Sequence, residues 1–378
     1  MTIIYVANLS GRDSPRGYSP NGFWITWTLQ ELGHTVISVN ESDVKAPEVL
    51  RLIQTFKPDL ILTEEARLFG DFQNAGEHDL LTGEFERVML DAHVPIVAWL
   101  TNIFHGVSRR EIQVKTNPIF KADVVFTTDG GHDAEWKKAG VNHVCLRQGI
   151  YEPEAYLGEP TYPTTADIVF IGSVYENIWP YRKKLVDWLK DKYGDRFQHL
   201  GERGDIRHDD LNNLLATAKI VVGDSVYSPH YWSNRVYEVI GRGGFLIHPV
   251  VEGLDAEFTP YKHYIPYHYG DFGGLKEKID YYLTHEAERR EIQLAGFEHA
   301  KRYHTYKHRV VKLLHELIDQ KVITGYYSAF PNGEPQLDKW SCGLPVSSTN
   351  TCGGAHCSQH KKPHYAHHPR ESFLEGES

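Results

Sequence analysis

Residues 220–249 read IVVGDSVYSPHYWSNRVYEVIGRGGFLIHP, and they contain one complete strand–helix–strand unit. The apolar run Ile220–Gly223 predicts a buried strand, Ser233–Ile240 predicts a short helix, and Phe245–His248 predicts a second strand. Two successive strands joined through a helix are typical of a parallel pair. The stretch therefore predicts a parallel sheet with helices packed on its faces.

The same alternation fills the N-terminal part of the chain. Apolar runs predict strands at Thr2–Ala7, Thr35–Val39, Asp59–Thr63, Pro95–Leu100, Asp123–Thr127 and Val144–Leu146. Amphipathic segments between them predict helices at Gly22–Leu32, Pro47–Phe56, Glu84–Ala92 and His132–Ala139. Five or six strands within about 150 residues indicate one doubly wound domain.

A second series begins after Tyr151–Thr165, a segment rich in proline and turn formers that we interpret as a linker. Further strands are expected at Asp167–Ile171 and Gln198–Gly201. Helices are expected at Tyr181–Tyr193, His208–Ala216, Leu275–His285, Ala287–Tyr303 and Tyr306–Gln320. The sequence thus predicts an N-terminal domain at 1–155, a C-terminal domain at 156–325 whose last helix packs back on the first, and an irregular tail at 326–378.

Composition narrows the class of protein. The 378 residues are 41% hydrophobic, as in ordinary globular proteins, which argues against disorder over the whole chain. Lys and Arg number 40 against 50 Asp and Glu, and the net charge of −10 argues against a general nucleic-acid-coating role. No long apolar run and no signal peptide are apparent, and Cys145 is the only cysteine before the tail, so we expect a cytoplasmic protein without membrane insertion.

Ligands of doubly wound sheets bind beyond the carboxyl ends of the strands, so ligand-binding residues are expected in the strand-to-helix loops. Ser233 or Asn234 is expected to cap the helix of the quoted stretch. Arg235 falls in the first turn of that helix, where the helix dipole disfavours a cation. A diphosphate bound at the start of the helix would explain why an arginine stands there. Glu238, on the same face of the helix, could accept hydrogen bonds from a ribose diol. The alternative is that Arg235 and Glu238 form a simple surface ion pair.

The pattern W-x-x-R-x-x-E-x-x-x-x-G-G over residues 232–244 resembles the donor-site helix of GT-B glycosyltransferases. It is similar in particular to the CgeB-like group (spore maturation protein type, relatives of glycosyl transferases group 1). The stretches GLDAEFTPYKHYIPYHYGDFGGLKEKIDYYL (253–283) and GFEHAKRYHTYKHRVVKLL (296–314) resemble the same group. The resemblance covers Ala166–Leu317 and implies an α/β, GT-B fold, with two Rossmann-like doubly wound domains facing across a cleft.

By position, the resemblance implies that Glu238 holds the nucleotide ribose. It further implies that Gly243 and Gly244 let the next loop approach the donor, and that Arg235 and Trp232 are donor-phosphate and loop residues. These expectations define a donor site in the C-terminal domain.

Two further elements of this donor site are expected. Relatives often carry a second glutamate eight residues before the first, but this chain has His230 there, which is a departure from the pattern. The Gly172-Ser173 loop follows a predicted strand, and similar loops of GT-B enzymes touch the donor phosphate through backbone N–H groups. A plain strand-to-helix turn is the alternative for Gly172 and Ser173.

Two candidates for an acid–base residue lie in the N-terminal domain. Asp13, in the loop Asn8–Asn21, has the chemistry of a base that removes a proton from an acceptor hydroxyl, or it is a solvated loop residue. His105 ends the stretch WLTNIFH, and a histidine near this position in related enzymes contacts the donor sugar or the acceptor. An inverting enzyme needs such a base, whereas a retaining one can use the leaving phosphate.

No metal or cofactor is expected. The sequence has no convincing DxD-like element, and Arg235 with helix N-termini can stabilise a leaving diphosphate without a metal. The tail holds Cys342, Cys352, Cys357 and several histidines, but it lacks paired CxxC knuckles. We therefore expect a flexible tail rather than a structural zinc site.

The sequence thus predicts a metal-independent hexosyl- or pentosyltransferase that moves a sugar from a nucleotide-diphosphate donor, UDP-linked, to an acceptor hydroxyl. The acceptor is a glycan, a protein or modified DNA, and the protein is a monomer or homodimer. One alternative is a phage-type DNA glycosyltransferase acting on a hydroxymethylated base, with Arg109, Arg110, Lys115 and Lys121 in its groove. Another is a non-catalytic nucleotide-sugar-binding or coat protein.

Overall fold

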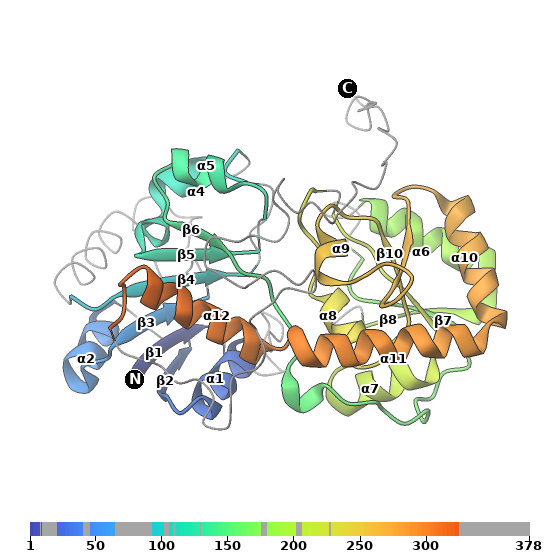
Figure 1. Ribbon diagram of the computed structural model, residues 1–378, viewed down its shortest axis with the longest axis horizontal. Coiled ribbons are helices and arrows are strands. Elements are labelled where there is room, and N and C mark those ends of the chain that lie inside the picture. Colours follow the sequence, from blue (N-terminus) through green and yellow to red (C-terminus); the bar gives the residue numbers. More distant parts are fainter. Residues whose placement is uncertain are drawn as a thin grey trace. The chain divides into compact units, whose positions relative to one another are not determined.

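The computed structural model describes residues 1–7, 9, 21–40, 46–64, 93–101, 106–108, 111–128, 130–174, 180–201, 206–226 and 228–324 (Figure 1). The predicted helix Glu84–Ala92, both acid–base candidates and the predicted tail lie outside these residues. Within them, no helix is long and apolar enough to cross a membrane.

The first sheet contains six parallel strands among the described residues, in the order β2-β1-β3-β4-β5-β6. They are β1 (Thr2–Ala7), β2 (Thr35–Asn40), β3 (Leu60–Thr63), β4 (Ile96–Leu100), β5 (Val124–Thr127) and β6 (His143–Cys145). The helices around them are α1 (Asn21–Glu31), α2 (Ala46–Phe56), α4 (Glu111–Thr116), α5 (Asp133–Lys138) and α12 (Tyr306–Asp319).

Strand β1 shows why these residues form a sheet that is covered on both sides. Ile3 and Tyr5 belong to a hydrophobic cluster with α1 and α12, whereas Ile4 and Val6 belong to a second cluster with α2 and α5. Successive side chains of a strand point to opposite faces, so a strand that is apolar at every position is buried on both. This burial explains the continuous apolar run from which the strand was predicted.

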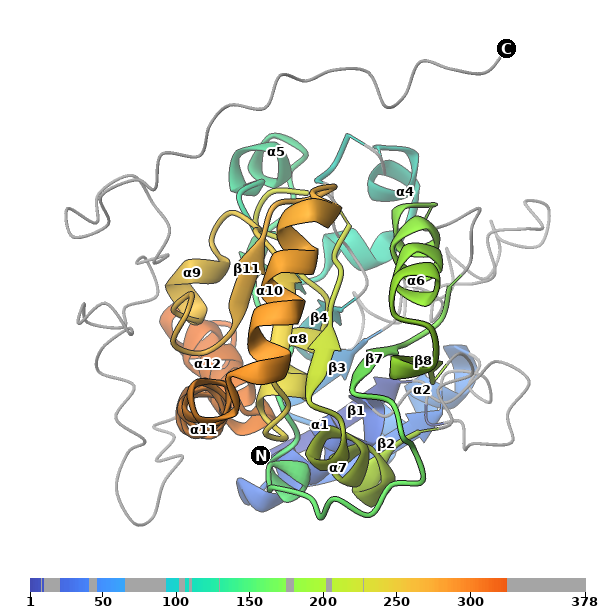
Figure 2. The same ribbon diagram turned by 90° about the vertical axis from the view of Figure 1, so that its right-hand side faces the viewer.

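The second sheet contains five parallel strands in the described part of the chain, in the order β11-β10-β9-β7-β8 (Figure 2). They are β7 (Ile168–Ile171), β8 (Phe197–Leu200), β9 (Ile220–Val222), β10 (Leu246–Pro249) and β11 (Ile265–Tyr267). The helices are α6 (Pro180–Tyr193), α7 (His208–Thr217), α8 (Arg235–Ile240), α9 (Leu254–Glu257), α10 (Phe272–Thr284) and α11 (Glu286–Tyr303). Helices α6 and α10 cover one face, and α7 and α8 cover the other.

Each sheet has a point at which its strand order reverses. Strand β1 lies between β2 and β3, and β7 lies between β8 and β9. At such points the crossover helices leave on opposite faces, which opens a ligand-binding crevice at the carboxyl ends of the two strands. The fold therefore predicts that ligand-binding residues follow β1 and β3 in the first sheet and β7 and β9 in the second.

The predicted parallel α/β architecture is confirmed, but some elements differ from the predictions. The helix expected from Ser233 begins at Arg235. Strand β11 was not predicted because Pro266 interrupts its sequence, and it lies at the edge of the sheet, where proline is tolerated. Helix α4 was missed because it has no buried residue and hence no apolar period.

The segment interpreted as a linker is packed against the second sheet's helices. Glu154, in this segment, is 7% exposed and forms an ion pair with Arg242. Just before it, the Ile150 N–H donates to His304 O at 2.8 Å, and the Tyr306 N–H donates to Ile150 O at 2.9 Å. The two stretches of chain that connect the sheets therefore run side by side.

Candidate functional site

Asp224 lies between two arginines where the order of the second sheet reverses. It follows β9 by two residues and is 2% exposed. Its Oδ1 is 2.5 Å from Arg235 Nη1, and its Oδ2 accepts a hydrogen bond from Arg182 Nε at 2.8 Å. Burial opposes ionisation of this carboxyl group, but Arg235 and Arg182 outweigh burial and hold its pKa below the usual range. The three side chains together carry one net positive charge at the carboxyl edge of the sheet.

The Arg235 guanidinium is oriented by the end of β7. Its Nε donates to Ile171 O at 2.7 Å, and its centre lies 4.8 Å from the centroid of the Phe170 ring. Because Nε and Nη1 are both engaged, the direction of Nη2 is set as well. Nη2 makes no hydrogen bond to the described residues and lies next to Gly172. The arginine therefore keeps one amine available for a ligand.

Gly172 is needed here for two reasons. Its φ of +129° is a backbone conformation that residues with a side chain rarely adopt, and a Cβ atom would lie 2.5 Å from Arg235 Nη2. Its N–H donates to Leu200 O at 2.9 Å, and its carbonyl accepts from His199 Nε2 at 2.7 Å. The expected contact of the Gly172 N–H with donor phosphate is therefore not supported, because that N–H completes the β7–β8 pairing.

Arg182 and Asp224 were missed by sequence reasoning, although a signal for Arg182 was present. Arg182 lies in the first turn of α6, and that first turn contains no acidic residue. Its Nη1 donates to Ser173 O at 2.8 Å. A cation in the first turn of the helix after a strand is the same feature that singled out Arg235. The structure thus brings together Gly172, Ser173 and Arg235 of the predicted donor site.

Replacing Gly172 by alanine is expected to lower both stability and the affinity for the UDP-linked donor that the sequence predicts. The left-handed φ costs of order 1–3 kcal/mol for a residue with a Cβ, and the new methyl group displaces Arg235 Nη2. Gly33→Ala is the matched control, because Gly33 has a φ of +84° and nothing within 4 Å of its Cβ position. Urea unfolding and calorimetric titration with UDP measure the two effects. Equal UDP affinity in both variants would contradict this role of Gly172.

Glu238 lies inside a separate buried ion cluster. It is 6% exposed, its Oε1 accepts from Asn234 Nδ2 at 3.1 Å, and its Oε2 accepts from Arg242 Nε at 3.0 Å. Arg242 also donates to Asn212 Oδ1 at 2.6 Å. The alternative of a surface ion pair between Arg235 and Glu238 is therefore wrong, since each has another partner.

The expected capping of α8 is also wrong. Asn234 is the residue at the cap position, but its side chain makes no capping hydrogen bond and donates to Glu238 instead. Among the residues that the structure describes, Ser233 Oγ and Asn234 Oδ1, both buried, have no hydrogen-bond partner. Unpartnered polar atoms are costly in a folded protein, so these two oxygens mark a place where a ligand or water would bind.

Gly243 and Gly244 have packing roles at the opposite edge of the sheet. Both precede β10, whereas the Asp224 cluster lies beyond the carboxyl ends of β7 and β9. A Cβ on Gly244 would lie 2.7 Å from Val239 Cγ1, and one on Gly243 would collide with Leu157. Gly243 also lines a cavity of about 170 Å³ with Arg242 and Gln293. The structure therefore does not place these glycines where they would make room for the donor.

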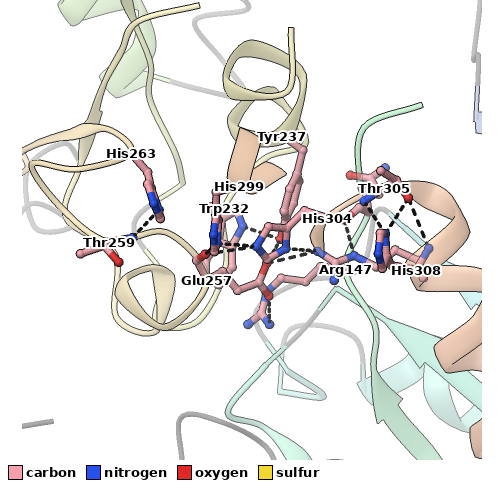
Figure 3. Close-up of polar contacts among 12 residues, drawn as sticks. Arg147, Trp232, Tyr237, Glu257, Thr259, His263, His299, His304, Thr305 and His308 are labelled. Carbon is pink, nitrogen blue, oxygen red and sulfur yellow. Dashed lines mark hydrogen bonds and ion pairs between the residues drawn. The ribbon is translucent and has the colours of Figure 1, made fainter. Parts of the chain in front are cut away.

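Trp232 forms part of a cluster around Arg147, which follows β6 (Figure 3). The Arg147 guanidinium lies 4.0 Å from the centroid of the Trp232 ring, and Trp232 Nε1 donates to Tyr237 Oη at 3.0 Å. Arg147 Nη2 donates to His230 O at 2.8 Å. Trp232 is 3% exposed, so the structure gives it a role in holding the loop rather than in touching phosphate.

His230 adopts a left-handed conformation with a φ of +56°. A Cβ on Gly131 would collide with its ring, and one on Gly253 would lie 2.7 Å from its Nδ1. Its Nε2 is 3.4 Å from Glu252 Oε1, and burial lowers the pKa of the imidazole. The structure thus places His230 in a cradle of two glycines, apart from the Asp224 cluster.

Glu257 is the anion of the Arg147 cluster (Figure 3). Its Oε1 is 3.4 Å from Arg147 Nη1, and its Oε2 accepts from Arg309 Nη2 at 3.2 Å and from Tyr237 Oη at 2.5 Å. Burial opposes its ionisation, but Arg309 and Arg147 outweigh burial, so the pKa of Glu257 falls to about 2. The Glu257 carboxylate thereby connects α9 with Arg309 of α12, with Tyr237 of α8 and with Arg147.

Buried histidines predict a loss of stability in mild acid. Burial lowers the pKa of His248 to about 4, of His263 to about 3 and of His308 to about 4. Because the unfolded chain takes up protons near pH 6.5 and the folded protein does not, stability is full above that pH and falls as the pH drops towards 4. For the fully buried His248 alone, the loss is about 3 kcal/mol.

Urea unfolding at several pH values between 7.5 and 4.5 measures this dependence. Glu257 stays ionised in the folded protein throughout that range. Because the unfolded carboxyl group takes up protons only as the pH approaches its ordinary pKa, Glu257 adds to the slope only near pH 4.5. His263→Gln removes one titrating group, keeps a hydrogen-bond acceptor for the Thr259 N–H and is expected to flatten the curve. A stability that is constant from pH 7.5 to 4.5 would refute this assignment.

The acid–base candidates Asp13 and His105 lie outside the described residues, as does the Cys/His-rich tail. Within the residues that the structure does describe, no group of three or more His, Cys, Asp or Glu side chains is arranged to hold a metal ion.

Solved structures share this arrangement of two parallel sheets. The glycosyltransferase from Rickettsia africae gives a TM-score of 0.56 at 13% identity, over 85% of this chain and 98% of that one. HepE from Anabaena in complex with UDP-glucose gives 0.56 at 12% identity, over 85% and 99%. Sucrose-phosphate synthase from Thermosynechococcus elongatus gives 0.57 at 14% identity, over 84% and 99%. The fold is thus the GT-B fold, which confirms the expected fold class.

Residues 182–315 match the family described as glycosyl transferase-like. The matched range begins at Arg182 and includes Asp224 and Arg235, so it contains all three charged residues at the reversal point of the second sheet. No curated protein sequence matches the chain. The narrower CgeB-like assignment stays a prediction.

Proposed function

We propose that this protein transfers a sugar from a UDP-sugar to an acceptor hydroxyl, and that the diphosphate of the donor binds at the Arg182–Asp224–Arg235 cluster. The observation that carries the proposal is the net positive charge of this cluster at the reversal point of the second sheet, with Arg235 Nη2 available. Support comes from the family match over the same residues and from a structural neighbour in complex with UDP-glucose. That neighbour also favours a hexose as the transferred sugar.

In this reaction the main task of the protein is to stabilise the negative charge that develops on the leaving diphosphate. The acceptor oxygen attacks the anomeric carbon, and its proton passes to a base in an inverting reaction or to the leaving phosphate in a retaining one. The bond from the anomeric carbon to the phosphate oxygen breaks, and UDP leaves with the electron pair. Arg182 and Arg235 are held in place by Asp224, so they stabilise the developing negative charge without rearranging. We propose that these two arginines replace a metal ion in this role.

The loop between β9 and α8 supplies further groups for the donor. Ser233 Oγ and Asn234 Oδ1 are buried without partners among the described residues. Ser233 Oγ would donate to a donor phosphate, and Asn234 Oδ1 would accept from a donor hydroxyl. Ribose binding by Glu238 would require Oε1 to exchange Asn234 Nδ2 for the diol, because Oε2 is bonded to Arg242. Glu238 can therefore bind the ribose only after the Asn234 side chain has released Oε1.

Calorimetric titration with UDP, followed by a panel of UDP-sugars with and without a chelator, tests the proposal. We expect UDP to bind, and we expect one donor to release UDP at the same rate in both conditions. Absence of UDP binding would refute the proposal, and dependence on a divalent cation would refute the role of the arginines. Binding without release from any donor would favour the non-catalytic alternative.

A further inference from the structure

The cavity beside Gly243 lies at the amino edge of the second sheet, away from the Asp224 cluster. Gly243 precedes β10, and Ala216, near the end of α7, precedes β9. The linker segment and α11 complete the walls. The volume of the cavity is about 170 Å³, and a cavity of about 150 Å³ is large enough for a molecule of the size of benzene. The second sheet therefore has room for a small ligand at the edge opposite to the proposed donor site.

Two guanidinium groups and one amide form the polar wall of this cavity, namely those of Arg242, Arg290 and Gln293. Arg290, on α11, is exposed and forms no ion pair with the residues that the structure describes. Its Nη1 donates to Gln293 Oε1 at 3.3 Å, and Gln293 Nε2 donates to Gly243 O. No acidic residue is among the described residues that line the cavity. The positive charge of Arg290 is therefore not neutralised there.

Arg242 belongs both to the cavity wall and to the buried ion cluster around Glu238. Its Nε donates to Glu238 Oε2 at 3.0 Å, and its Nη2 pairs with both Glu154 and Glu238. Its Nη1 donates to Asn212 Oδ1 at 2.6 Å. A guanidinium group has five N–H donors, so one N–H of Nη1 is left without an acceptor among the described residues. Arg242 can therefore donate a hydrogen bond to a ligand without giving up its carboxylates.

The rest of the cavity wall is apolar and is held in place. Leu157, Pro160 and Ala216 supply it. A Cβ on Gly243 would collide with Leu157, so the glycine keeps that side of the cavity open. The Glu159 N–H donates to Asn213 Oδ1 at 2.9 Å, which fixes the linker segment to α7. A cavity with fixed apolar walls and a few polar groups is typical of a small-molecule site.

We propose that this cavity is a second ligand site, which binds a small organic oxyanion through Arg242 and Arg290. The oxyanion is a carboxylate or a phosphate monoester, because guanidinium groups form charge-assisted hydrogen bonds with both. The body of the ligand packs against the apolar side of the cavity. A nucleoside diphosphate is too large for this volume, and a metal cation would face two guanidinium groups. The site is separate from the donor site, so this inference does not depend on the proposed function.

Calorimetric titration of the full chain with phenyl phosphate, benzoate and neutral benzyl alcohol tests the site. Each probe is titrated with and without saturating UDP, which occupies the proposed donor site. At least one of the two anions is expected to bind, and benzyl alcohol is expected to bind about 10-fold more weakly or less, because it forms no charge-assisted hydrogen bond. Tighter binding of phenyl phosphate identifies the ligand class as a phosphate monoester, and tighter binding of benzoate identifies it as a carboxylate.

Variants assign the binding to this cavity, whether or not UDP binds. Arg290→Gln is expected to weaken the anion about 10-fold or more, whereas Arg302→Gln, an exposed arginine of the same helix that does not line the cavity, has no effect. Ala216→Leu keeps the charges, fills the cavity and is expected to weaken the anion as well. If Ala216→Leu does not fold, the exposed Arg290 still decides. Absence of binding by both anions, equal binding of benzyl alcohol, unchanged affinity in Arg290→Gln, or displacement of the anion by UDP would overturn the proposal.

Discussion

Arg235→Lys is expected to bind UDP about 10- to 100-fold more weakly than the unchanged protein, the scale of a lost charge-assisted hydrogen bond. Lysine keeps a positive charge opposite Asp224, but a single ammonium group cannot bond Ile171 O and Asp224 Oδ1 and still present an amine beside Gly172. Calorimetric titration with UDP measures the effect, and thermal unfolding checks that the fold is retained.

Arg196→Lys is the matched control for this variant. Arg196 pairs with Asp167, its side chain is 55% exposed, and Asp167 precedes β7, so the pair lies at the other edge of the sheet. Arg235→Ala is expected to weaken UDP binding by a similar factor and also to lose stability, because Asp224 then keeps only one of its two arginines. An unchanged dissociation constant in Arg235→Lys would remove Arg235 from the donor site.

Glu257→Gln is expected to lower the free energy of unfolding by about 3–5 kcal/mol, the cost of removing one partner from a buried ion pair. Arg147 and Arg309 both point at this carboxylate, and with glutamine there they remain buried as two like charges. The shape of the side chain is kept, so the loss reflects charge rather than packing. The urea concentration at the midpoint of unfolding measures it.

Glu48→Gln, on the surface of α2, is the control for this stability prediction. Glu48 pairs with Arg51, and both side chains are largely exposed, so its neutralisation is expected to change stability little. UDP affinity of folded Glu257→Gln should be close to that of the unchanged protein, since Glu257 has no bond to Arg182, Asp224 or Arg235. A midpoint for Glu257→Gln equal to that of Glu48→Gln would show that the cluster does not stabilise the fold.

The sheets were predictable because their strands carry a local signal. Ile3 to Val6 alternate between two buried faces, so every position is apolar, and Gly33 and the Lys57-Pro58 break separate such runs from the helices. Strand β11 lacked this signal because Pro266 interrupts it, and the helix expected from Ser233 was two residues too long. Capping by Ser233 or Asn234 is a tendency of residue type, and here Glu238 engages Asn234 instead.

The donor site was predictable only in part, for a similar reason. Arg235 could be singled out because a cation in the first turn of a helix is a local anomaly. Its partner could not be found in this way, since Asp224 is eleven residues away and an aspartate after a strand is an ordinary feature. The roles expected for Trp232 and Gly243 followed a family pattern, but the structure gives these two residues packing contacts.

By itself, the amino-acid sequence determined where most of the strands and helices form, that the strands are parallel and buried on both faces, and that a cation begins the helix after β9. Only the tertiary structure decided which charges meet: Arg182 reaches Asp224 from 42 residues away, and Glu257 reaches Arg147 from 110. The physical reason is that a buried charge must be neutralised by whatever lies beside it in space. Strand order determines that neighbour, and in these sheets strand order differs from the order of the chain.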